Sequence, residues 1–274
     1  MKLPVHALIL GALGAFGAFT GAAHAQGTAY GVDGQHKLWL VDLSTAGATL
    51  VGTITASGVD LTAQALGMDP AGTLYAASSN SGLYTVNLST AAATLVGFTG
   101  LGPVVSMDWD AVNGRMLIGN LSATPSIYSI NLTTAAVSLV VTATSASSAI
   151  QTFATRSVGG VLDVRHSSGI AGSFGDKFAT LDSSSGVVTT LAGVFSDISG
   201  MDYGSDGLLY GLTKFGRLVR IGPTGLEVDI GLVNGGVAFT GMTSVVPEPA
   251  PVLLWAAGCA SLLWRRRCLL QRCV

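Results

Sequence analysis

Residues 66–97, LGMDPAGTLYAASSNSGLYTVNLSTAAATLVG, contain one complete copy of a unit that recurs along the chain. An apolar run ends at 67–69, a turn containing Pro and Gly follows, and further runs begin at Leu74, Leu83 and Thr94. Short apolar runs joined by tight turns are typical of antiparallel β-hairpins. The stretch therefore predicts a meander of four antiparallel strands.

The third strand of this unit, with its turn, occurs five times. Its copies are 38–45, 83–90, 127–134, 178–184 and 218–225. The residues that end these strands are 45, 44, 51 and 40 positions apart: Asp42, Asn87, Asn131, Asp182 and Gly222. A period of about 40–50 residues for four strands is typical of propeller blades.

A three-residue pattern in the first strand of the unit, which we call the marker, also occurs five times. Its copies are Gly67-Met68-Asp69, Ser106-Met107-Asp108, Gly200-Met201-Asp202 and Gly241-Met242-Thr243, with a degenerate copy at Thr152-Phe153-Ala154. Three of these contain an aspartate followed by a glycine a few residues later, at 72, 114 and 207. We interpret Asp69, Asp108 and Asp202 as residues that open Asx-type turns, in preference to a ring of metal ligands.

The two ends of the repeat region complement each other. The first unit starts at Ala29-Tyr30-Gly31, which matches a second strand, and the missing first strand appears at 239–244. A ring closed by this last strand leaves no large unpaired edge. We therefore expect an all-β fold: a five-bladed β-propeller of four-stranded antiparallel blades over 26–246, closed by the N- and C-terminal strands, plus a C-terminal transmembrane helix.

Composition narrows the classes of function. The 274 residues are 49% hydrophobic and 10% charged, which is typical of a folded chain. Between 26 and 246 there are 8 Lys/Arg and 14 Asp/Glu, and this acidic balance argues against nucleic acid as a partner. All three cysteines lie in the last sixteen residues, and the body has only two histidines, His36 and His166. We expect no metal site in the body.

The N-terminus has the pattern of a signal peptide. Lys2 precedes an apolar run from Val5 to Phe19, and Ala23 and Ala25 stand at the −3 and −1 positions that signal peptidase accepts. We expect a signal peptide over 1–25. An uncleaved N-terminal anchor is the alternative, but the run is short for a membrane span.

The C-terminus has three ordered parts. Pro247-Glu248-Pro249 leads into the uncharged apolar run 250–264, and Arg265-Arg266-Arg267 follows. We expect a minimal transmembrane helix at 250–264, with the arginines and the tail 268–274 in the cytoplasm. This arrangement resembles the PEP-CTERM sorting signal, here over 247–267; the alternative is a simple tail anchor.

The resemblance implies processing by exosortase in a Gram-negative bacterium that makes exopolysaccharide. The expected localisation is the inner membrane before processing, and then the cell surface or extracellular matrix. The repeats themselves are similar to those of quinoprotein-like and other bacterial surface propellers. Quinoprotein enzymes hold their cofactor with tryptophan stacking, and only Trp39 and Trp109 lie in the body. We expect no cofactor.

No catalytic motif is evident, so the candidate site rests on loop length. The longest inter-strand segment, 166–177, contains His166 and Asp176, and we expect Asp60 and Asp197 to lie across the channel from it. A solvated glycine-rich insertion is the simpler interpretation of this segment. The leading functional hypothesis is a non-catalytic surface or exopolysaccharide-matrix protein that binds polysaccharide or surface proteins. The alternative is a hydrolase or lyase with carboxylates at the channel mouth.

Overall fold

The computed structural model describes residues 27–122, 124–144, 150–157, 159–167 and 176–245. The expected signal peptide, the sorting signal with its helix at 250–264 and the tail 268–274 lie outside the described residues. In the part of the chain that the structure describes, no helical segment has the length and apolarity that a bilayer crossing requires.

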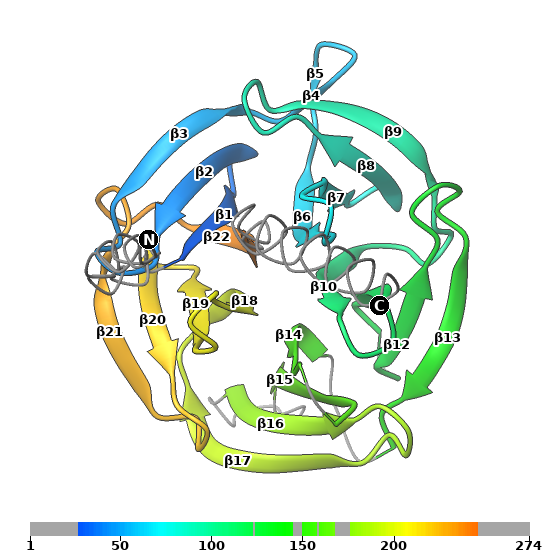
Figure 1. Ribbon diagram of the computed structural model, residues 1–274, viewed down its shortest axis with the longest axis vertical. Coiled ribbons are helices and arrows are strands. Elements are labelled where there is room, and N and C mark those ends of the chain that lie inside the picture. The colour runs from blue at the N-terminus through cyan, green and yellow to red at the C-terminus, as the bar shows by residue number, and fades with distance from the viewer. Residues whose placement is uncertain (1–26, 123, 145–149, 158, 168–175, 246–274) are drawn as a thin grey trace, which may run out of the picture.

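Five sheets, each with four antiparallel strands as its blade, are arranged around a central axis, as the sequence period predicts (Figure 1). We name them blades A to E and give their strands from the axis outwards. Blade A is β22 (Phe239–Ser244), β1 (Thr28–Asp33), β2 (Lys37–Asp42) and β3 (Ala48–Thr53); blade B is β6 (Ala63–Met68), β7 (Leu74–Ser78), β8 (Gly82–Val86) and β9 (Ala92–Phe98); blade C is β10 (Val104–Asp110), β11 (Arg115–Asn120), β12 (Ser126–Ile130) and β13 (Val137–Thr142); blade D is β14 (Ile150–Thr155), β15 (Val161–Ser167), β16 (Asp176–Asp182) and β17 (Val188–Phe195); blade E is β18 (Ile198–Tyr203), β19 (Leu209–Thr213), β20 (Arg217–Ile221) and β21 (Glu227–Leu232).

The ring closes as the sequence predicts. The C-terminal strand β22 pairs antiparallel with the N-terminal strand β1, with Met242 opposite Gly31 and Thr243 opposite Tyr30. The pairing continues past both strands, because the backbone N–H of Val245 donates to the carbonyl of Thr28 over 2.8 Å. Blade A is thus assembled from the two ends of the described chain.

One small hairpin adds to the outside of the ring. Strands β4 (Thr55–Ala56) and β5 (Val59–Asp60) pair with each other, and β4 extends the outer edge of blade B by a parallel pairing with β9. The hairpin projects from the rim of the molecule (Figure 1). The sequence period did not predict it.

The turns between third and fourth strands share one design. A side-chain oxygen at the end of the third strand accepts backbone N–H groups from two and three residues further on; the residues are Asp42, Asn87, Asn131 and Asp182. In three of these turns an alanine has a left-handed backbone, and Ala91 is one, at φ 56°. Its methyl group packs on the outer strand of the preceding blade, blade A, since a Cβ on Gly52 would lie 3.4 Å from it.

Every inner strand also has a β-bulge near its start. In β6, Ala63 is opposite Ser78 and Ala65 is opposite Ala77, so Gln64 has no partner residue. The same step occurs in the other four inner strands. The bulged residues are Gln64, Val105, Gln151, Ser199 and Thr240. A bulge changes the direction of a side chain, and here it does so once per blade at one end of the axis.

Close contact between inner strands predicts a sensitive position at the closure of the ring. A Cβ on Gly200 of β18 would lie 2.7 Å from the carbonyl carbon of Gly241 in β22, and backbone atoms cannot move aside as a flexible side chain can. We expect Gly200→Ala to lower the free energy of unfolding by about 1–3 kcal/mol, as overpacking does. Denaturant unfolding of the two proteins measures this difference.

Gly34→Ala is the matched control, because a Cβ there would meet only the carbonyl oxygen of Ala238 at 3.8 Å. Its stability should equal that of the wild type. A Gly200→Ala protein as stable as Gly34→Ala would contradict the close packing of β22 against blade E.

Candidate functional site

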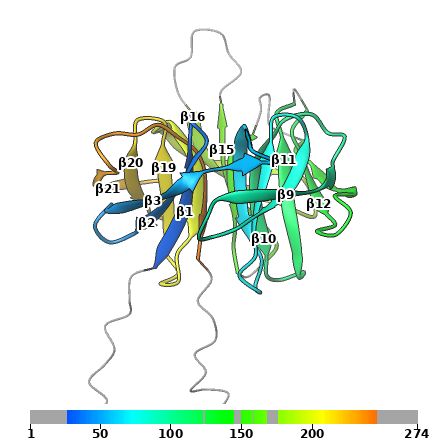
Figure 2. The same cartoon turned by 90° about the horizontal axis from the view of Figure 1, so that it is seen from above.

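Two pockets lie at opposite ends of the axis. The larger, of about 710 Å³, opens on the face where β1 starts and β22 ends, and Ser244 and Val245 contribute to its wall. The smaller, of about 510 Å³, contains the five bulged residues and opens on the opposite face. The view in Figure 2, perpendicular to the axis, separates these two faces. We call the first the aspartate pocket, after Asp108 and Asp202, and the second the bulge pocket.

Asp108 and Asp202 occupy equivalent positions in blades C and E. Asp108 is opposite Leu117, and Asp202 is opposite Tyr210, each three residues after a turn glycine. The equivalent residues of the other inner strands are Gly67, Ala154 and Thr243. The five-fold repeat therefore brings two carboxyl groups to one level of the axis, with small or hydroxyl-bearing residues between them.

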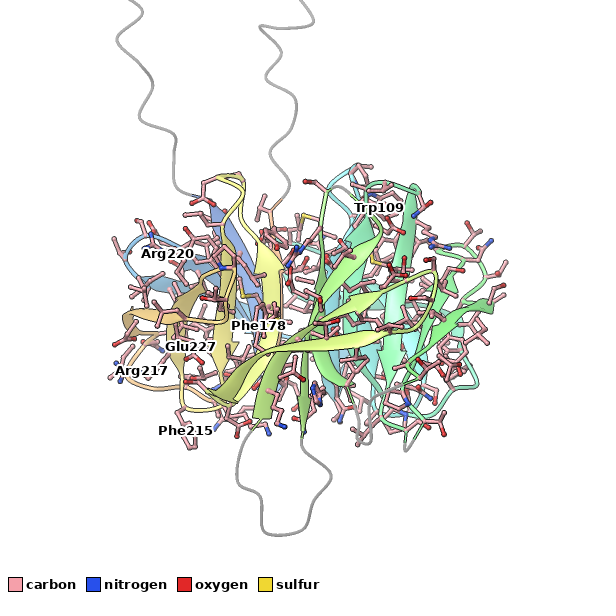
Figure 3. The ribbon with its side chains drawn as sticks, turned by 90° about the horizontal axis from the view of Figure 1, so that it is seen from below. Trp109, Phe178, Phe215, Arg217, Arg220 and Glu227 are labelled. Carbon is pink, nitrogen blue, oxygen red and sulfur yellow. The ribbon has the colours of Figure 1, made fainter. Side chains whose placement is uncertain are left out.

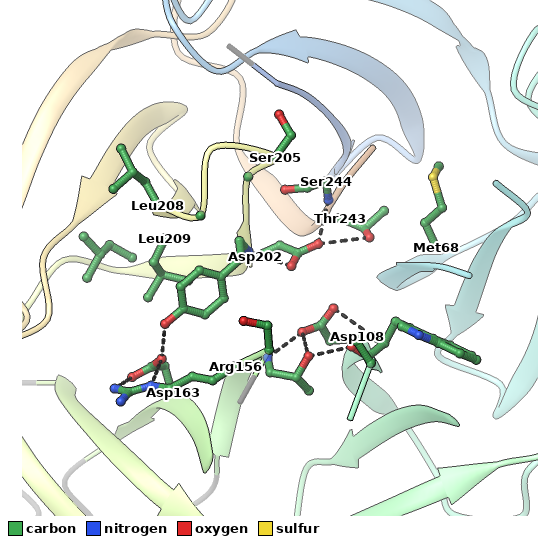
Figure 4. Close-up of a pocket in the computed structure, with 18 of the residues that line it drawn as sticks. Met68, Asp108, Arg156, Asp163, Asp202, Ser205, Leu208, Leu209, Thr243 and Ser244 are labelled. Carbon is green, nitrogen blue, oxygen red and sulfur yellow. Dashed lines mark hydrogen bonds and ion pairs between the residues drawn. The ribbon is translucent and has the colours of Figure 1, made fainter. Parts of the chain in front are cut away.

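Each of the two carboxylates joins its own blade to the next. Asp108 accepts the backbone N–H of Thr155 in blade D over 2.6 Å, and the Thr155 hydroxyl lies 2.9 Å from the same oxygen. Asp202 accepts the backbone N–H of Ser244 in blade A over 2.6 Å. Figure 4 shows the two side chains with these partners. The pair thus connects the inner strands of four blades at this end of the ring.

Both carboxyl groups hold a proton more tightly than a solvated aspartate does. Burial, followed by the negative charge of Asp202, raises the pKa of Asp108 well above its ordinary value. Burial also raises the pKa of Asp202 to about 6, although the N–H groups of Ser244 and Tyr203 act in the opposite direction. Neighbouring carboxyls titrate as a pair. Each of the two groups therefore keeps its proton to a higher pH than a solvated aspartate does.

A third acidic group forms the side wall. Asp163 is 1% exposed, accepts two hydrogen bonds from the Arg156 guanidinium over 2.7 and 2.8 Å, and accepts the Tyr203 hydroxyl over 2.6 Å. Burial and this bond raise the pKa of Tyr203, and the bond to Asp163 raises the pKa of Arg156. Both partners of Asp163 therefore stay protonated, and the network is a fixed polar wall.

The remaining wall is largely apolar. The apolar residues that line it include Met68, Trp109, Leu208, Leu209 and Ile221. A pocket with apolar walls and a few fixed polar groups is the usual form of a small-molecule site. Within the described ranges, no group of three or more His, Cys, Asp or Glu residues is placed to hold a metal ion.

The sequence-predicted site residues lie elsewhere. Asp197 is near the bulge pocket and forms ion pairs with Arg165 and Lys214, the latter at 3.1 Å. His166 is 8% exposed in β15, and Asp176 begins β16, where its backbone is opposite Ser167; the side chain of Asp176 is not among the described parts.

Asp60 is exposed on the β4–β5 hairpin at the outer rim. Asp60 therefore does not lie at the channel across from 166–177, as expected from the sequence. The reason is that residues 54–61 do not form a loop at the axis but return along the outer strand β9, where β4 finds an edge with which to pair.

The interpretation of the three marker aspartates is correct for one of them. Asp69 opens a turn, since its Oδ1 accepts the N–H groups of Ala71 and Thr73. For Asp108 and Asp202 it is wrong, because both lie inside strands and the turns begin two residues later. The spacing in the sequence indicates this difference between the blades. The turn glycine follows the marker methionine by four residues in blade B, by seven in blade C and by six in blade E.

Comparisons with known proteins bear on the fold. No family model and no curated protein matches the chain. Among solved structures, the nidogen/laminin complex matches with a TM-score of 0.52 at 11% identity, covering 81% of this chain and 86% of that one. The body is a β-propeller.

Two bacterial structures match less closely. The gluconolactonase XC5397 from Xanthomonas campestris has a TM-score of 0.49 at 12% identity, with 77% of this chain and 78% of that chain covered. A putative TolB from Agrobacterium tumefaciens has a TM-score of 0.44 at 16% identity, with 74% and 69% covered. At such identities these similarities concern the fold alone.

The raised pKa of Asp202 predicts a specific pH dependence. An acid whose pKa is higher in the folded than in the unfolded protein favours folding fully below the unfolded value, and this stability is lost as the pH rises towards the folded value. We expect the free energy of unfolding of the wild type, relative to Asp202→Asn, to fall by about 2 kcal/mol between pH 4 and pH 7. Urea unfolding at a series of pH values measures it.

Asp60→Asn is the control, because Asp60 is exposed on the outer hairpin. Its stability should follow the wild-type pH profile. If Asp202→Asn follows that profile as well, Asp202 does not hold its proton in the way the pocket requires.

Proposed function

We propose that this protein is an exported propeller that binds a hydroxyl-rich ligand, such as a saccharide segment, without catalysing a reaction. The aspartate pocket is the observation that carries the proposal. Its two carboxyl groups, whose pKa values are raised, can donate as well as accept hydrogen bonds when protonated, and Trp109 supplies aromatic surface beside them. Sugars present this combination of hydroxyl groups and apolar C–H faces.

The hydrogen bonds of the carboxyl pair favour binding over catalysis. The oxygens of Asp108 accept the N–H groups of Trp109 and Thr155, and those of Asp202 accept the N–H groups of Tyr203 and Ser244. A general acid must change its protonation state in each turnover. In this pocket such a change would alter the contacts that join neighbouring blades.

The terminal sequences support export as the second part of the proposal. Signal peptidase would cleave after Ala25, and exosortase would act near Pro247-Glu248-Pro249 while Arg265-Arg266-Arg267 stays in the cytoplasm. The proposed destination is the cell surface or exopolysaccharide matrix of a Gram-negative bacterium. Because Val245 lines the aspartate pocket, a membrane-held C-terminus would keep this pocket near the bilayer, and processing would open it to the matrix.

One observation favours a second candidate, a hydrolase or lyase that uses Asp108 and Asp202 as acid and base. Paired carboxyls with raised pKa values in a pocket are frequent in active sites. The two candidates differ in the fate of the ligand, which stays intact in a binding protein and is cleaved by an enzyme.

Binding to matrix polysaccharide tests the proposed function. We expect the released protein to be retarded in a gel that contains exopolysaccharide from its host. Trp109→Ala should lower the affinity for the polysaccharide about tenfold, because it removes the aromatic side chain from the pocket wall. Phe215→Ala is the matched control, since Phe215 is 70% exposed on the opposite face (Figure 3). Equal retardation of wild type and Trp109→Ala would contradict binding at this pocket. Shortening of the polymer that Asp202→Asn abolishes would support the enzyme instead.

Sorting is tested separately in the host. Replacing Glu248 by Ala should leave the protein in the inner-membrane fraction, because the Pro-Glu-Pro triplet would no longer direct processing. Fractionation and immunoblotting measure this, with Asp60→Ala as a carboxylate substitution in the exposed hairpin. Release of the Glu248→Ala protein at the wild-type level would contradict sorting by the Pro-Glu-Pro triplet.

A further inference from the structure

The carboxyl pair of the aspartate pocket has no cationic partner in the described part of the chain. Asp108 and Asp202 both line the pocket, and Asp108 is only 5% exposed. Among the described residues, no Lys, Arg or His forms an ion pair with either of them. A buried carboxylate is normally paired with a cation, or it keeps a proton instead. Burial raises the pKa of both groups, so without a ligand they follow the second course.

The other charges on the pocket wall compensate each other. Arg156 and Asp163 line the pocket as well, and the guanidinium donates to both carboxylate oxygens over 2.7 and 2.8 Å. The charged residues on this wall, among those described, are this ion pair and the carboxyl pair. The charge left without a partner is therefore the negative charge of Asp108 and Asp202 when they are ionised.

Both groups of the carboxyl pair keep some acceptor capacity. An ionised carboxylate has about four acceptor sites. Asp108 accepts three hydrogen bonds from described residues, namely from two backbone N–H groups and the Thr155 hydroxyl. Asp202 likewise accepts two backbone N–H groups and the Thr243 hydroxyl. Each group can therefore accept one more hydrogen bond when it is ionised.

A third oxygen beside the pair has no partner. Ser244 is 5% exposed and lines the aspartate pocket, and its Oγ has no hydrogen-bond partner among the described atoms. Its backbone N–H donates to Asp202 over 2.6 Å, so the residue is held next to the carboxyl pair (Figure 4). Buried polar groups normally have a partner, from the protein, from water or from a ligand. The Ser244 hydroxyl therefore adds a third free acceptor at the same place.

We infer that the ligand of the aspartate pocket is an amino sugar, bound through its ammonium group. An ammonium has three N–H donors and no acceptor, and the pocket offers it one acceptor on each carboxylate and a third on Ser244 Oγ. The ammonium would replace the protons that the pair holds without a ligand, and these protons pass to the solvent. The sugar ring would lie on the apolar wall beside Trp109, in a volume of about 710 Å³. The inference rests on the proposed function and names the saccharide that the pocket selects.

Calorimetric titration of the released protein with D-glucosamine hydrochloride, at pH 7 and low ionic strength, tests this site. We expect saturable binding of one molecule, at least tenfold stronger than that of N-acetyl-D-glucosamine, because acetylation removes the charge from the same ring. Butylamine, an ammonium without a sugar ring, should bind at least tenfold more weakly than D-glucosamine. Calcium chloride should not displace the sugar, and added NaCl should weaken its binding.

Two variants separate the acceptors of the pocket. Asp202→Asn keeps the shape of the side chain and removes its charge, so it should weaken D-glucosamine binding about tenfold and affect N-acetyl-D-glucosamine much less. Ser244→Ala keeps the backbone hydrogen bond to Asp202 and should weaken D-glucosamine binding severalfold. Asp60→Asn is the matched control, because it removes a carboxylate from the exposed outer hairpin. It should bind D-glucosamine as the wild type does.

Several outcomes would each overturn the inference: no binding of D-glucosamine, equal affinity for N-acetyl-D-glucosamine or for butylamine, displacement by calcium at equal concentration, or equal effects of Asp202→Asn and Asp60→Asn. Equal affinity for butylamine would assign the pocket to amines in general, such as a lysine side chain. Retardation by polysaccharide that depends on Trp109, without binding of D-glucosamine, would overturn this inference and support the proposed function. Binding of D-glucosamine without retardation would contradict only the binding of matrix polysaccharide.

Discussion

The pairing of β22 with β1 is the interaction on which the rest of the structure depends. Because the innermost strand of blade A comes from the far end of the chain, the ring exists only when the two ends are joined. Once joined, β22 also packs between its neighbours: a Cβ on Gly200 would collide with it from blade E, and a Cβ on Gly241 would lie 2.9 Å from the carbonyl oxygen of Gln64 in blade B. The five inner strands then define both pockets.

The two mouths of the ring differ in chemistry although the blades share one backbone plan. At one level of the inner strands the five equivalent residues include two aspartates, and at the level of the bulges they are two amides, two hydroxyls and a valine. Repetition thus positions the side chains, and single substitutions between blades decide what each mouth can bind. The aspartate pocket holds the buried pair Asp108 and Asp202, and the charged residues described on the wall of the bulge pocket are Arg165 and Lys214.

The sequence predicts the repeat well and the sites poorly, for a physical reason. Strand period and turn chemistry depend on neighbouring residues. The turns at Asp42 and Asn87 and the ring-closing strand at 239–244 could therefore be located from residue type and spacing alone. A register shift is not determined locally in this way. Whether Asp108 opens a turn or faces the axis depends on a two- or three-residue difference in the following turn, and a one-residue slip moves a side chain to the other face. The bulges have no compositional signal, since their residues range from Val105 to Gln151.

The strand that completes blade A is also the strand that leads into the C-terminal segment. A load applied to that segment acts along β22, which is hydrogen-bonded along its length to β1 and flanked by the inner strands of blades E and B. These hydrogen bonds lie perpendicular to the strands, so a pull along β22 loads all of them at the same time. They do not break one after another. Tension on the tail is therefore transmitted through β22 to the centre of the ring.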